Sequence, residues 1–598
     1  MAKKNIPIKY TSRDFASIKQ DLVNYAQRYY ADSFRDFNEA GFGALMLDTV
    51  AYVGDILSFY LDYQTNESFL DTAIEYDNVA RLASQLGYKL QLNPTSYGIV
   101  SLFVLVPAAS SGPGPDSKYF PILRKGSSFS ALNGGMFLLT EDVNFASSNH
   151  ETVVARVDPS SGVPTFYAVK ARAKVMSGEL IRTTFEVGAH QRFLTLEVPA
   201  TNVAEITSIV DLEGHRYFEV EHLSQDIIYA EVPNRISNID TVKSIIKPVS
   251  VPRRFVTINT STGMKIQFGY GSETEIKKNS IVDPSNVVLK QYARDYTTDR
   301  TFDPSRLNQT DKFGVVPSNT TLYVTYRGNG VVNTNVSANS LNTVVQPAFE
   351  FNDRASLNSE TIRAVIGSLE VNNADPIVGD VSLPTSREIK KRAKDFFATQ
   401  SRAVTKTDYV AYIYNMPEKF GTIKRANIIP DSDSFKRNLN LYVVSESSDG
   451  SLAVSNSLIK QNLKTWLNKN KMVHDTVDIL DAKIINLGID YVLLADDRAN
   501  KFDLVKGVTS ALRTELLAVL PDIGEAFDIS TVYSIINSVP GVVDAVDVEV
   551  VLKRGTSYSD LYYDIPANLS PDGRLVTFPE DYIWEIKFPF SDIRGSVQ

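Results

Sequence analysis

The sequence contains no cysteine and few histidines. Without cysteine the chain can form neither a disulfide nor a cysteine-ligated metal site, and it suits synthesis in a reducing cytoplasm. No histidine stands in an HExxH motif or has a second histidine at the spacing of helical zinc ligands. The histidines are His150, His190, His215, His222 and His474. The sequence therefore predicts no metal site and no cofactor.

An excess of basic residues is also missing. The 61 basic residues are outnumbered by 70 acidic ones, and the net charge is −9. Nucleic-acid-binding domains are usually basic. The basic cluster at residues 390–394 is typical of a solvated helix face, because acidic residues lie near it. We therefore expect no nucleic-acid partner.

Long apolar runs are scarce. The longest strongly apolar stretch is residues 99–109, whereas a membrane helix needs about 20 residues. The first residues, MAKKNIPIKYTSRDF, contain two lysines but no apolar run behind them, so they do not resemble a signal peptide. We expect no membrane span.

The common catalytic motifs are absent as well. The sequence has no GxSxG, no GxxxxGK[ST] and no GxGxxG, which mark hydrolases and nucleotide-binding loops. The glycines at Gly269 and Gly271 follow an expected strand and do not open a helix, so they indicate a β-turn. The sequence predicts a protein that is not an enzyme.

The first 95 residues are expected to form helices. Ser12 is a candidate N-cap, and apolar residues then recur at spacings of three and four. A second helix follows Gly43, with only Asp48 and Asp55 charged between residues 41 and 61. A helix that is apolar around so much of its circumference is expected to be buried on more than one side. One of its stripes consists of Met46, Val50, Val53, Leu57 and Tyr60.

Two interpretations of this helix remain open. In the first, it packs inside an ordinary three-helix bundle with a helix before it and one at residues 77–86. In the second, the stripe from Met46 to Tyr60 packs against another chain. We predict the second arrangement for that face.

Beyond Asn93 and Pro94 the apolar period changes to two. The strand that starts near Tyr97 is apolar on both faces, so it is expected to be central or sandwiched. Short strands separated by Gly, Pro, Asn and Asp continue to about residue 345, at residues 136–140, 183–187, 193–198, 255–260, 264–268 and 321–326 among others. Such spacing is typical of sandwiches or barrels. The length indicates two β units, one inserted within the other.

Helices return at residues 386–399 and after Thr405, and strands and helices then alternate to residue 552. This alternation favours split β-α-β domains. The expected fold class is multidomain α+β: an N-terminal helical bundle, central β-sandwich domains and C-terminal split β-α-β domains. The predicted segments are residues 1–95, 96–350, 351–425, 426–555 and an aromatic-rich, loop-like extension at 556–598.

The segment RAVTKTDY, residues 402–409, has a clear local interpretation. Thr405 can cap the helix that follows, and Asp408, three residues later, can accept from the free N–H groups of the same terminus. A functional alternative is that Arg402 and Asp408 form a buried pair at a site. We interpret Arg402, Thr405, Asp408 and Tyr409 as a structural motif.

This segment resembles the "RAVT-x-x-DY" signature of baseplate-J-like proteins of contractile phage tails. KIQFGYG (265–271) is similar to that family's strand ending in "FGdG", with Tyr270 in place of the usual Asp, and VTYRGNGVVN (324–333) resembles its "tYr-x-G-x-x-x-N" turn. Arg124 to Gly126 and Gly541 to Val543 resemble further parts of it, and residues 43–70 resemble the helices of large wedge proteins. The resemblance implies ferredoxin-like units in the C-terminal split β-α-β domains.

The resemblance to baseplate-J-like proteins also implies a scaffold function. The protein would be a virion subunit of the tail baseplate, assembled in the cytoplasm of the host bacterium, with dimerisation and ring contacts in residues 426–555. Its implied partners are itself, with two copies in each wedge and about twelve in a sixfold baseplate, other wedge proteins, and sheath-initiator and hub-side proteins. The alternatives are a tail-associated glycan hydrolase, which needs paired carboxylates in a cleft, and a host-binding adhesin.

Overall fold

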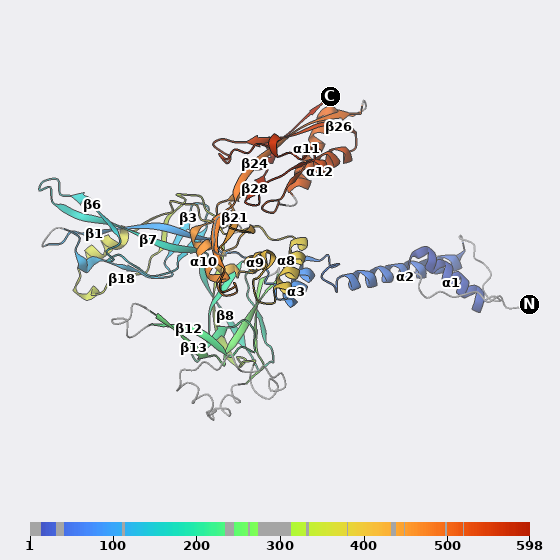
Figure 1. Ribbon diagram of the computed structural model, residues 1–598. Coiled ribbons are helices and arrows are strands. Elements are labelled where there is room, and N and C mark those ends of the chain that lie inside the picture. Colours follow the sequence, from blue (N-terminus) through green and yellow to red (C-terminus); the bar gives the residue numbers. More distant parts are fainter. Residues whose placement is uncertain are drawn as a thin grey trace, which may run out of the picture. The chain divides into compact units, whose positions relative to one another are not determined.

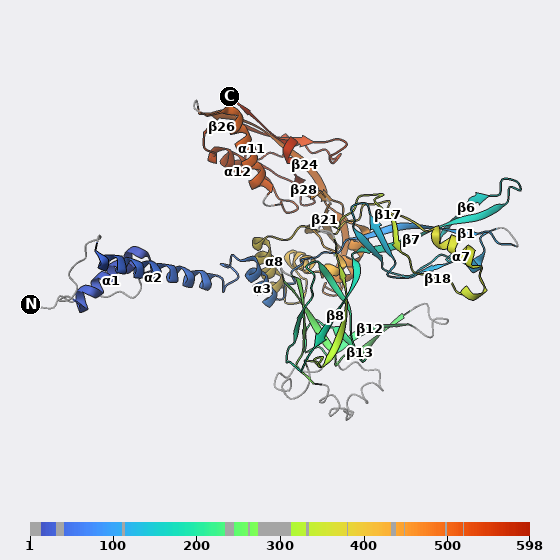
Figure 2. The ribbon, with the colours of Figure 1, turned by 180° about the vertical axis from the view of Figure 1, so that it is seen from behind.

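The chain divides into two compact units, each described by itself below. One comprises Met1–Tyr88 and Pro384–Phe397, and the other Lys89–Leu383 and Ala398–Gln598. Figures 1 and 2 show the helices and strands of both units, coloured along the sequence. The computed structural model describes residues 13–30, 41–110, 114–233, 244–260, 263–272, 313–330, 334–379, 381–431, 438–447, 449–496, 499–517 and 520–598.

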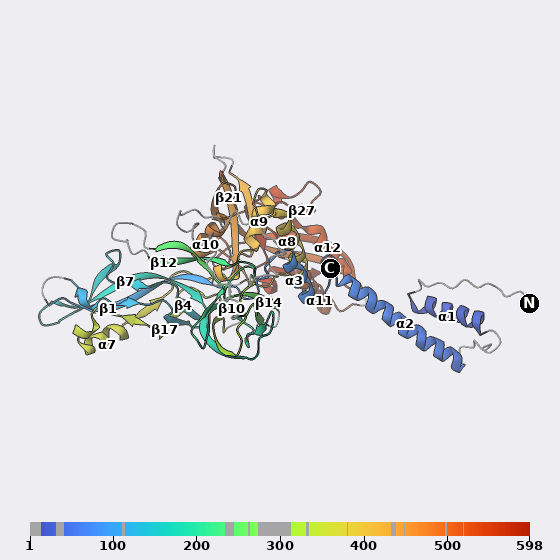
Figure 3. The same cartoon turned by 90° about the horizontal axis from the view of Figure 1, so that it is seen from below.

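The first unit begins with an antiparallel helical hairpin of α1 (Phe15–Tyr29) and α2 (Phe42–Asn66), visible in Figure 3. Asp14 caps α1 by accepting a hydrogen bond from the Ser17 amide at 3.0 Å, while Ser12 lies outside the described residues. Ile18 packs on Gly54, where an added Cβ would lie 3.3 Å from the Ile18 Cδ1 atom. The glycine therefore permits the close approach of the two helices.

The described residues do not bury α2 on more than one side, so that expectation is wrong for this part of the chain. The buried residues of α2 are Ala44 and Ala51. The physical reason is length, because the 15 residues of α1 cannot enclose a helix of 25 residues. By length and composition alone, α2 is also a helix that could cross a membrane. Asp48 and Asp55 interrupt its apolar run in the sequence.

The rest of the first unit is α3 (Tyr76–Gln85) and most of α8 (Ser386–Thr399). The Lys390 ammonium of α8 donates to the Asp71 carbonyl at 2.9 Å, in the segment between α2 and α3. Ile389 and Ala393 of α8 are fully buried, whereas Phe397 is 63% exposed. The structure thus has a two-helix hairpin and a separate contact to α8.

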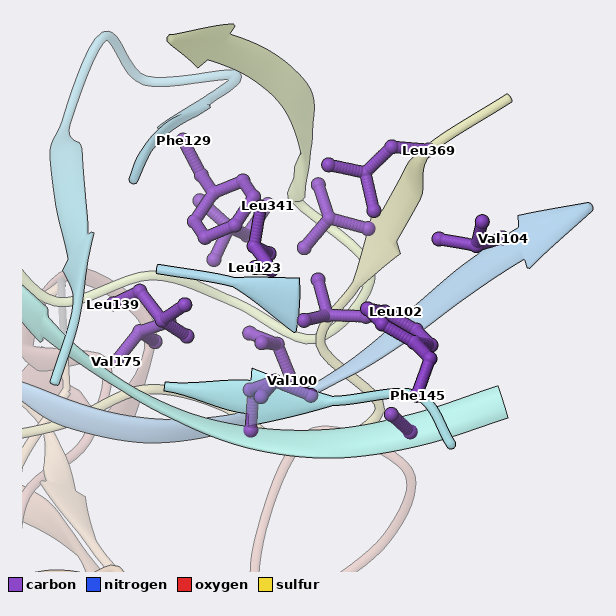
Figure 4. Close-up of a cluster of buried hydrophobic side chains, with 14 of the residues drawn as sticks. Val100, Leu102, Val104, Leu123, Phe129, Leu139, Phe145, Val175, Leu341 and Leu369 are labelled. Atoms are coloured by element: carbon purple, nitrogen blue, oxygen red, sulfur yellow. The ribbon is translucent and has the colours of Figure 1, made fainter. Parts of the chain in front are cut away.

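The second unit contains a seven-stranded sheet in which β1 lies between β7 and the edge strand β19. The order is β17-β3-β4-β7-β1-β19, with β6 also paired to β7. Alternate residues of β1 are buried and form one core with β3, β4 and β7 (Figure 4). The strands are β1 (Tyr97–Pro107), β3 (Ser128–Ala131), β4 (Met136–Leu139), β6 (Glu151–Val157), β7 (Pro164–Ser177), β17 (Leu341–Gln346) and β19 (Glu370–Asn372).

Smaller elements cover this sheet. Helix α7 (Ser359–Gly367) packs on β1, and its Ile362 and Val365 join the core. A three-stranded sheet is made of β2 (Ile122–Leu123), β5 (Val143–Asn144) and β18 (Phe349–Glu350).

A second seven-stranded sheet is formed entirely by residues that lie in sequence between β7 and β17. Its order is β8-β16-β10-β11-β14-β15-β9. The strands are β8 (Glu179–Val187), β9 (Thr195–Glu197), β10 (Val203–Asp211), β11 (Arg216–Glu219), β14 (Arg254–Thr260), β15 (Gly263–Phe268) and β16 (Thr320–Gly328). Strands β12 (Ile227–Pro233) and β13 (Ser244–Ser250) form a hairpin of their own.

The C-terminal half of this unit contains two α+β layers. In the first, α9 (Lys406–Tyr414) and α10 (Ser457–Leu467) accompany β20 (Arg425–Pro430), β21 (Asn438–Glu446), β22 (Leu452–Ala453) and β23 (Thr476–Asp481). In the second, α11 (Lys501–Leu517) and α12 (Ile529–Ser538) accompany β24 (Lys483–Ala495) and β26 (Val542–Lys553).

The last residues are not loop-like, which corrects the expectation for residues 556–598. β28 (Tyr582–Glu585) and β29 (Ile593–Val597) both pair in parallel with β24. Ile583 and Ile593 are 0% and 3% exposed, so this aromatic-rich segment completes the sheet of its own chain. A short helix, α13 (Pro589–Asp592), connects the two strands, and β25 (Phe527–Asp528) pairs with β27 (Leu575–Val576).

Candidate assembly site

The stripe of α2 that we singled out faces away from α1. Ala44 and Ala51 are buried, and Asp48 forms an ion pair with Lys19 of α1 at 2.7 Å, so these positions mark the side toward α1. With 3.6 residues per turn, the stripe lies on the opposite side of the helix. It contains Met46, Val50, Val53, Leu57 and Tyr60. α1 therefore leaves this surface free.

All five side chains of the stripe are exposed, from 48% at Val53 to 61% at Tyr60. Leu45, Tyr52 and Phe59 on the neighbouring stripe are at least as exposed as Val53. Burial of one such side chain is worth about 1.5–3 kcal/mol. Contiguous exposed apolar surface of this extent is uncommon on monomeric proteins.

The RAVTKTDY segment has the capping geometry that its spacing predicts. The Thr405 hydroxyl accepts from the Asp408 amide at 3.2 Å. The Asp408 carboxylate in turn accepts from the amides of Thr405 at 2.9 Å and Val404 at 3.0 Å. This reciprocal pair is a capping box, which satisfies main-chain donors that a helix start leaves free.

Tyr409 connects this helix to the loop after α10. Its ring is 1% exposed, and its hydroxyl donates to the Asp475 carboxylate at 2.7 Å. Burial, together with this bond, raises the pKa of Tyr409. The Ala403 amide donates to the Asn470 carbonyl at 2.9 Å in the same loop. The motif thus holds α9 against its neighbour.

Arg402 does not form the buried pair considered as the functional alternative. Its side chain is exposed, and Asp408 is only partly buried. The oxygen of Asp408 that faces the helix start is used by two amides. The physical reason is that residue 402 precedes the helix, where the chain still runs along the surface.

The sequence did not reveal the buried polar junction around Glu418. Glu418 is 7% exposed, and its carboxylate accepts from the amides of Leu92 at 2.8 Å and Asn93 at 2.9 Å. The Asn259 side-chain amide donates to its other oxygen at 2.9 Å. Burial raises the pKa of Glu418, against the effect of these bonds. No local signal could reveal the junction, because its members are far apart in sequence.

Arg327 forms a second buried junction within the same unit. Its side chain is fully buried, and its guanidinium donates to the Glu205 carboxylate and to the Thr95 hydroxyl, each at 2.9 Å. A buried arginine with partners of this kind is costly to disrupt. It belongs to the VTYRGNGVVN segment (324–333), whose last residues, 331–333, lie outside the described residues.

One cavity of about 220 Å³ contains carboxylates. Glu585 and Asp449 are both on its lining, and burial raises the pKa of Glu585 to about 7. However, Glu585 is 7% exposed, and its two oxygens accept from the Leu452 amide at 2.7 Å and from Asn486 at 3.1 Å. This carboxyl is therefore engaged by its own fold and is not displayed toward a substrate.

Comparison with known families gives one match. Residues 14–85 match the family model described as bacteriophage baseplate protein, N-terminal domain. The matched segment covers the exposed helix α2 and its hairpin partner. The match supports a baseplate protein with a structural role, located in a phage tail baseplate. No curated protein matches the chain.

Two solved structures are similar to the chain at low scores. One is the cryo-EM structure of the anti-feeding prophage (AFP) baseplate, with 8% identity over 94% of this chain and 89% of that chain and a TM-score of 0.23. The other is the TssK-TssF-TssG baseplate subcomplex of a type VI secretion system, with 8% identity over 74% of this chain and 96% of that chain and a TM-score of 0.22. Scores at this level do not establish a shared fold.

Proposed function

We propose that the chain is a non-enzymatic wedge subunit of the baseplate-J-like type. It pairs with a second copy and with other wedge proteins, and wedges close into a sixfold ring around the tail hub, with sheath-initiator and hub-side proteins as further neighbours. Assembly takes place in the host cytoplasm. This proposal extends the baseplate match of residues 14–85 by means of the RAVTKTDY resemblance.

The observation that supports it most directly is the exposed stripe of α2. The stripe lies inside the segment that matches the baseplate domain. Its five side chains would be buried in a bundle with helices from other chains, as in helical bundles generally. The gain of about 1.5–3 kcal/mol for each buried side chain exceeds what weak surface ion pairs can supply.

The first prediction changes two residues of this stripe, Val53→Asp and Leu57→Asp, in the full chain. Because both side chains are about half exposed, at 48% and 57%, the monomer should fold normally. Burying two carboxylates in a bundle is strongly unfavourable. We expect loss of wedge assembly, measured as incorporation into purified baseplates, with an unchanged melting temperature.

The matched control is Leu132→Asp, since Leu132 is 74% exposed in a turn of the second unit. This control should assemble as the wild type does. If the Val53 and Leu57 variant also assembles normally, the stripe is not the bundling surface.

The C-terminal layers, by resemblance, are ferredoxin-like domains for dimerisation and ring closure. β21 and β23 pair directly in parallel and are connected through α10, so this layer contains a β-α-β unit with no strand between its two strands. The RAVTKTDY motif has an architectural role in this proposal, because it fixes α9 to the loop that ends at Asp475.

A further inference from the structure

Strand β6 is an exposed edge strand with an apolar sequence. All seven of its residues are exposed, and Val153, Val154 and Val157 are 53%, 49% and 48% exposed. Within the described residues β6 pairs with β7 alone, as Figure 1 shows at the outer end of that sheet. One row of its main-chain donors and acceptors is therefore available to another strand.

This edge differs from that of β26, which also borders a sheet. Asp544, Asp547 and Glu549 of β26 are exposed, and charged residues of this kind protect edges from pairing with other chains. Between Glu151 and Arg156, β6 has only Thr152, Val153, Val154 and Ala155, none of which is charged. Its sequence therefore does not oppose edge pairing.

The side chains on one face of β6 follow a pattern that complements itself. Val153 lies beside Ala168 of β7, which lies beside Leu105 of β1, so an apolar row crosses three strands. On one side of this row Glu151 pairs with Lys170 at 3.7 Å. On the other side stands Arg156, whose guanidinium lies 5.8 Å from the centre of the Phe166 ring.

A bulge places Arg156 on this face. Val154 lies opposite Tyr167 and Arg156 opposite Phe166, so Ala155 is the extra residue of β6. The Arg156 side chain consequently shares a face with Glu151 and Val153. In an antiparallel pair with Val153 opposite Val153 of a second copy, Glu151 of each copy faces the bulge that contains Arg156 of the other.

We propose that β6 is a docking edge for β6 of a second copy of this chain, in antiparallel orientation around Val153. The pairing joins the two sheets and makes the apolar row from Leu105 to Val153 continuous across both copies. The two Glu151–Arg156 contacts fix the register, as opposite charges facing each other across strands do. This surface is separate from the α2 stripe, so either proposal can fail without the other.

The test uses the absence of cysteine in this chain. A single Val153→Cys substitution creates one thiol, and directly opposite residues in an antiparallel pair have Cβ atoms about 4.5–5.5 Å apart. We expect the full-length variant at micromolar concentration, oxidised with diamide, to form disulfide-linked dimers on a non-reducing gel. The control is Val163→Cys, because Val163 is 58% exposed in the turn between β6 and β7.

The charges provide a second readout in the Val153→Cys background. Adding Arg156→Glu should reduce the dimer yield several-fold, and adding Glu151→Arg to that variant should recover it. All these residues are exposed, so folding is not at risk. Equal cross-linking of the Val153→Cys and Val163→Cys variants overturns the proposal. A dimer yield that does not change when the charges are altered also overturns the proposal, because it indicates cross-linking by random collision.

Discussion

Thr405 and Asp408 show what one pair of residues contributes to this chain. Their reciprocal bonds satisfy three main-chain amides at the start of α9. Removal of a helix cap costs about 0.5–2 kcal/mol. We therefore predict that Thr405→Ala and Asp408→Ala each lower the melting temperature of the full chain and reduce baseplate incorporation in proportion, measured by thermal unfolding and by assembly on the same samples.

Thr407→Ala is the control for this pair, since Thr407 is exposed on the same helix and makes no cap. Its melting temperature should match or exceed that of the wild type, because Ala favours helix. A catalytic role would give the opposite pattern, with stability and assembly intact in the cap variants and an activity lost. Normal stability and assembly in both cap variants would contradict the architectural role.

Glu585 makes stability depend on pH. Its pKa rises from 4.5 to about 7 in the folded chain, chiefly because burial disfavours the charged carboxylate. A raised pKa means that the folded state binds the proton more tightly. This contribution is therefore fully present below the unfolded pKa of the group and is lost as pH rises through the folded one.

We predict that the wild type loses about 3 kcal/mol of unfolding free energy relative to Glu585→Gln between about pH 4.5 and about pH 8. Glutamine does not titrate, so the difference between the two proteins isolates this group. Urea unfolding at several pH values measures it. A difference that stays constant across this range would show that Glu585 titrates normally.

At the residue scale, sequence spacing predicted the contacts between residues that are close in sequence. The Thr405 cap depends on residues three apart. The partner of Tyr409, Asp475, and the partners of Glu418 lie 66 to 326 positions away. The types of these residues gave no sign of such pairings, and Glu418 in particular resembles an ordinary surface glutamate in sequence.

At the scale of elements, the period of apolar residues predicted most helices and strands. Residues 386–399 form α8 with the expected bounds, and the expected strands at 255–260 and 264–268 are β14 and β15. β28 was missed although it has 4 residues like β4, because the aromatic-rich residues around it show no strand period. Its place in the sheet depends on β24, far away in sequence.

β28 and β29 provide a prediction at this scale. Ile583→Ala and Ile593→Ala should each lower the free energy of unfolding by about 2–5 kcal/mol, because each removes a buried side chain and leaves a cavity. Chemical denaturation of the full chain measures the loss. Tyr562→Ala is the matched control in the same segment, since Tyr562 is 66% exposed. An equal, small effect in all three variants would mean that the last strands do not stabilise the sheet.

At the scale of the whole molecule, the exposed stripe of α2 bears on assembly, and the buried Glu418 junction bears on folding. Among the described residues no segment covers the stripe of α2, whose side chains remain about half exposed, so the burial that the apolar pattern predicts is not reached within them. The buried Glu418 has donors at Leu92, Asn93 and Asn259. A fragment starting at residue 350 would lose all three, so self-pairing is best measured on the full chain.

The nesting of one sheet inside another has a consequence for synthesis on the ribosome. β3 ends at Ala131, but its neighbour β17 begins only at Leu341, and the whole second sheet lies between them. At about 5–20 residues per second, this interval lasts roughly 10–40 seconds. During it the edge of β3 has no β17 to pair with, while β8 to β16 are synthesised one after another. The inner sheet therefore emerges in full before the outer one can close, and the nascent chain exposes an open strand edge to chaperones for all of that time.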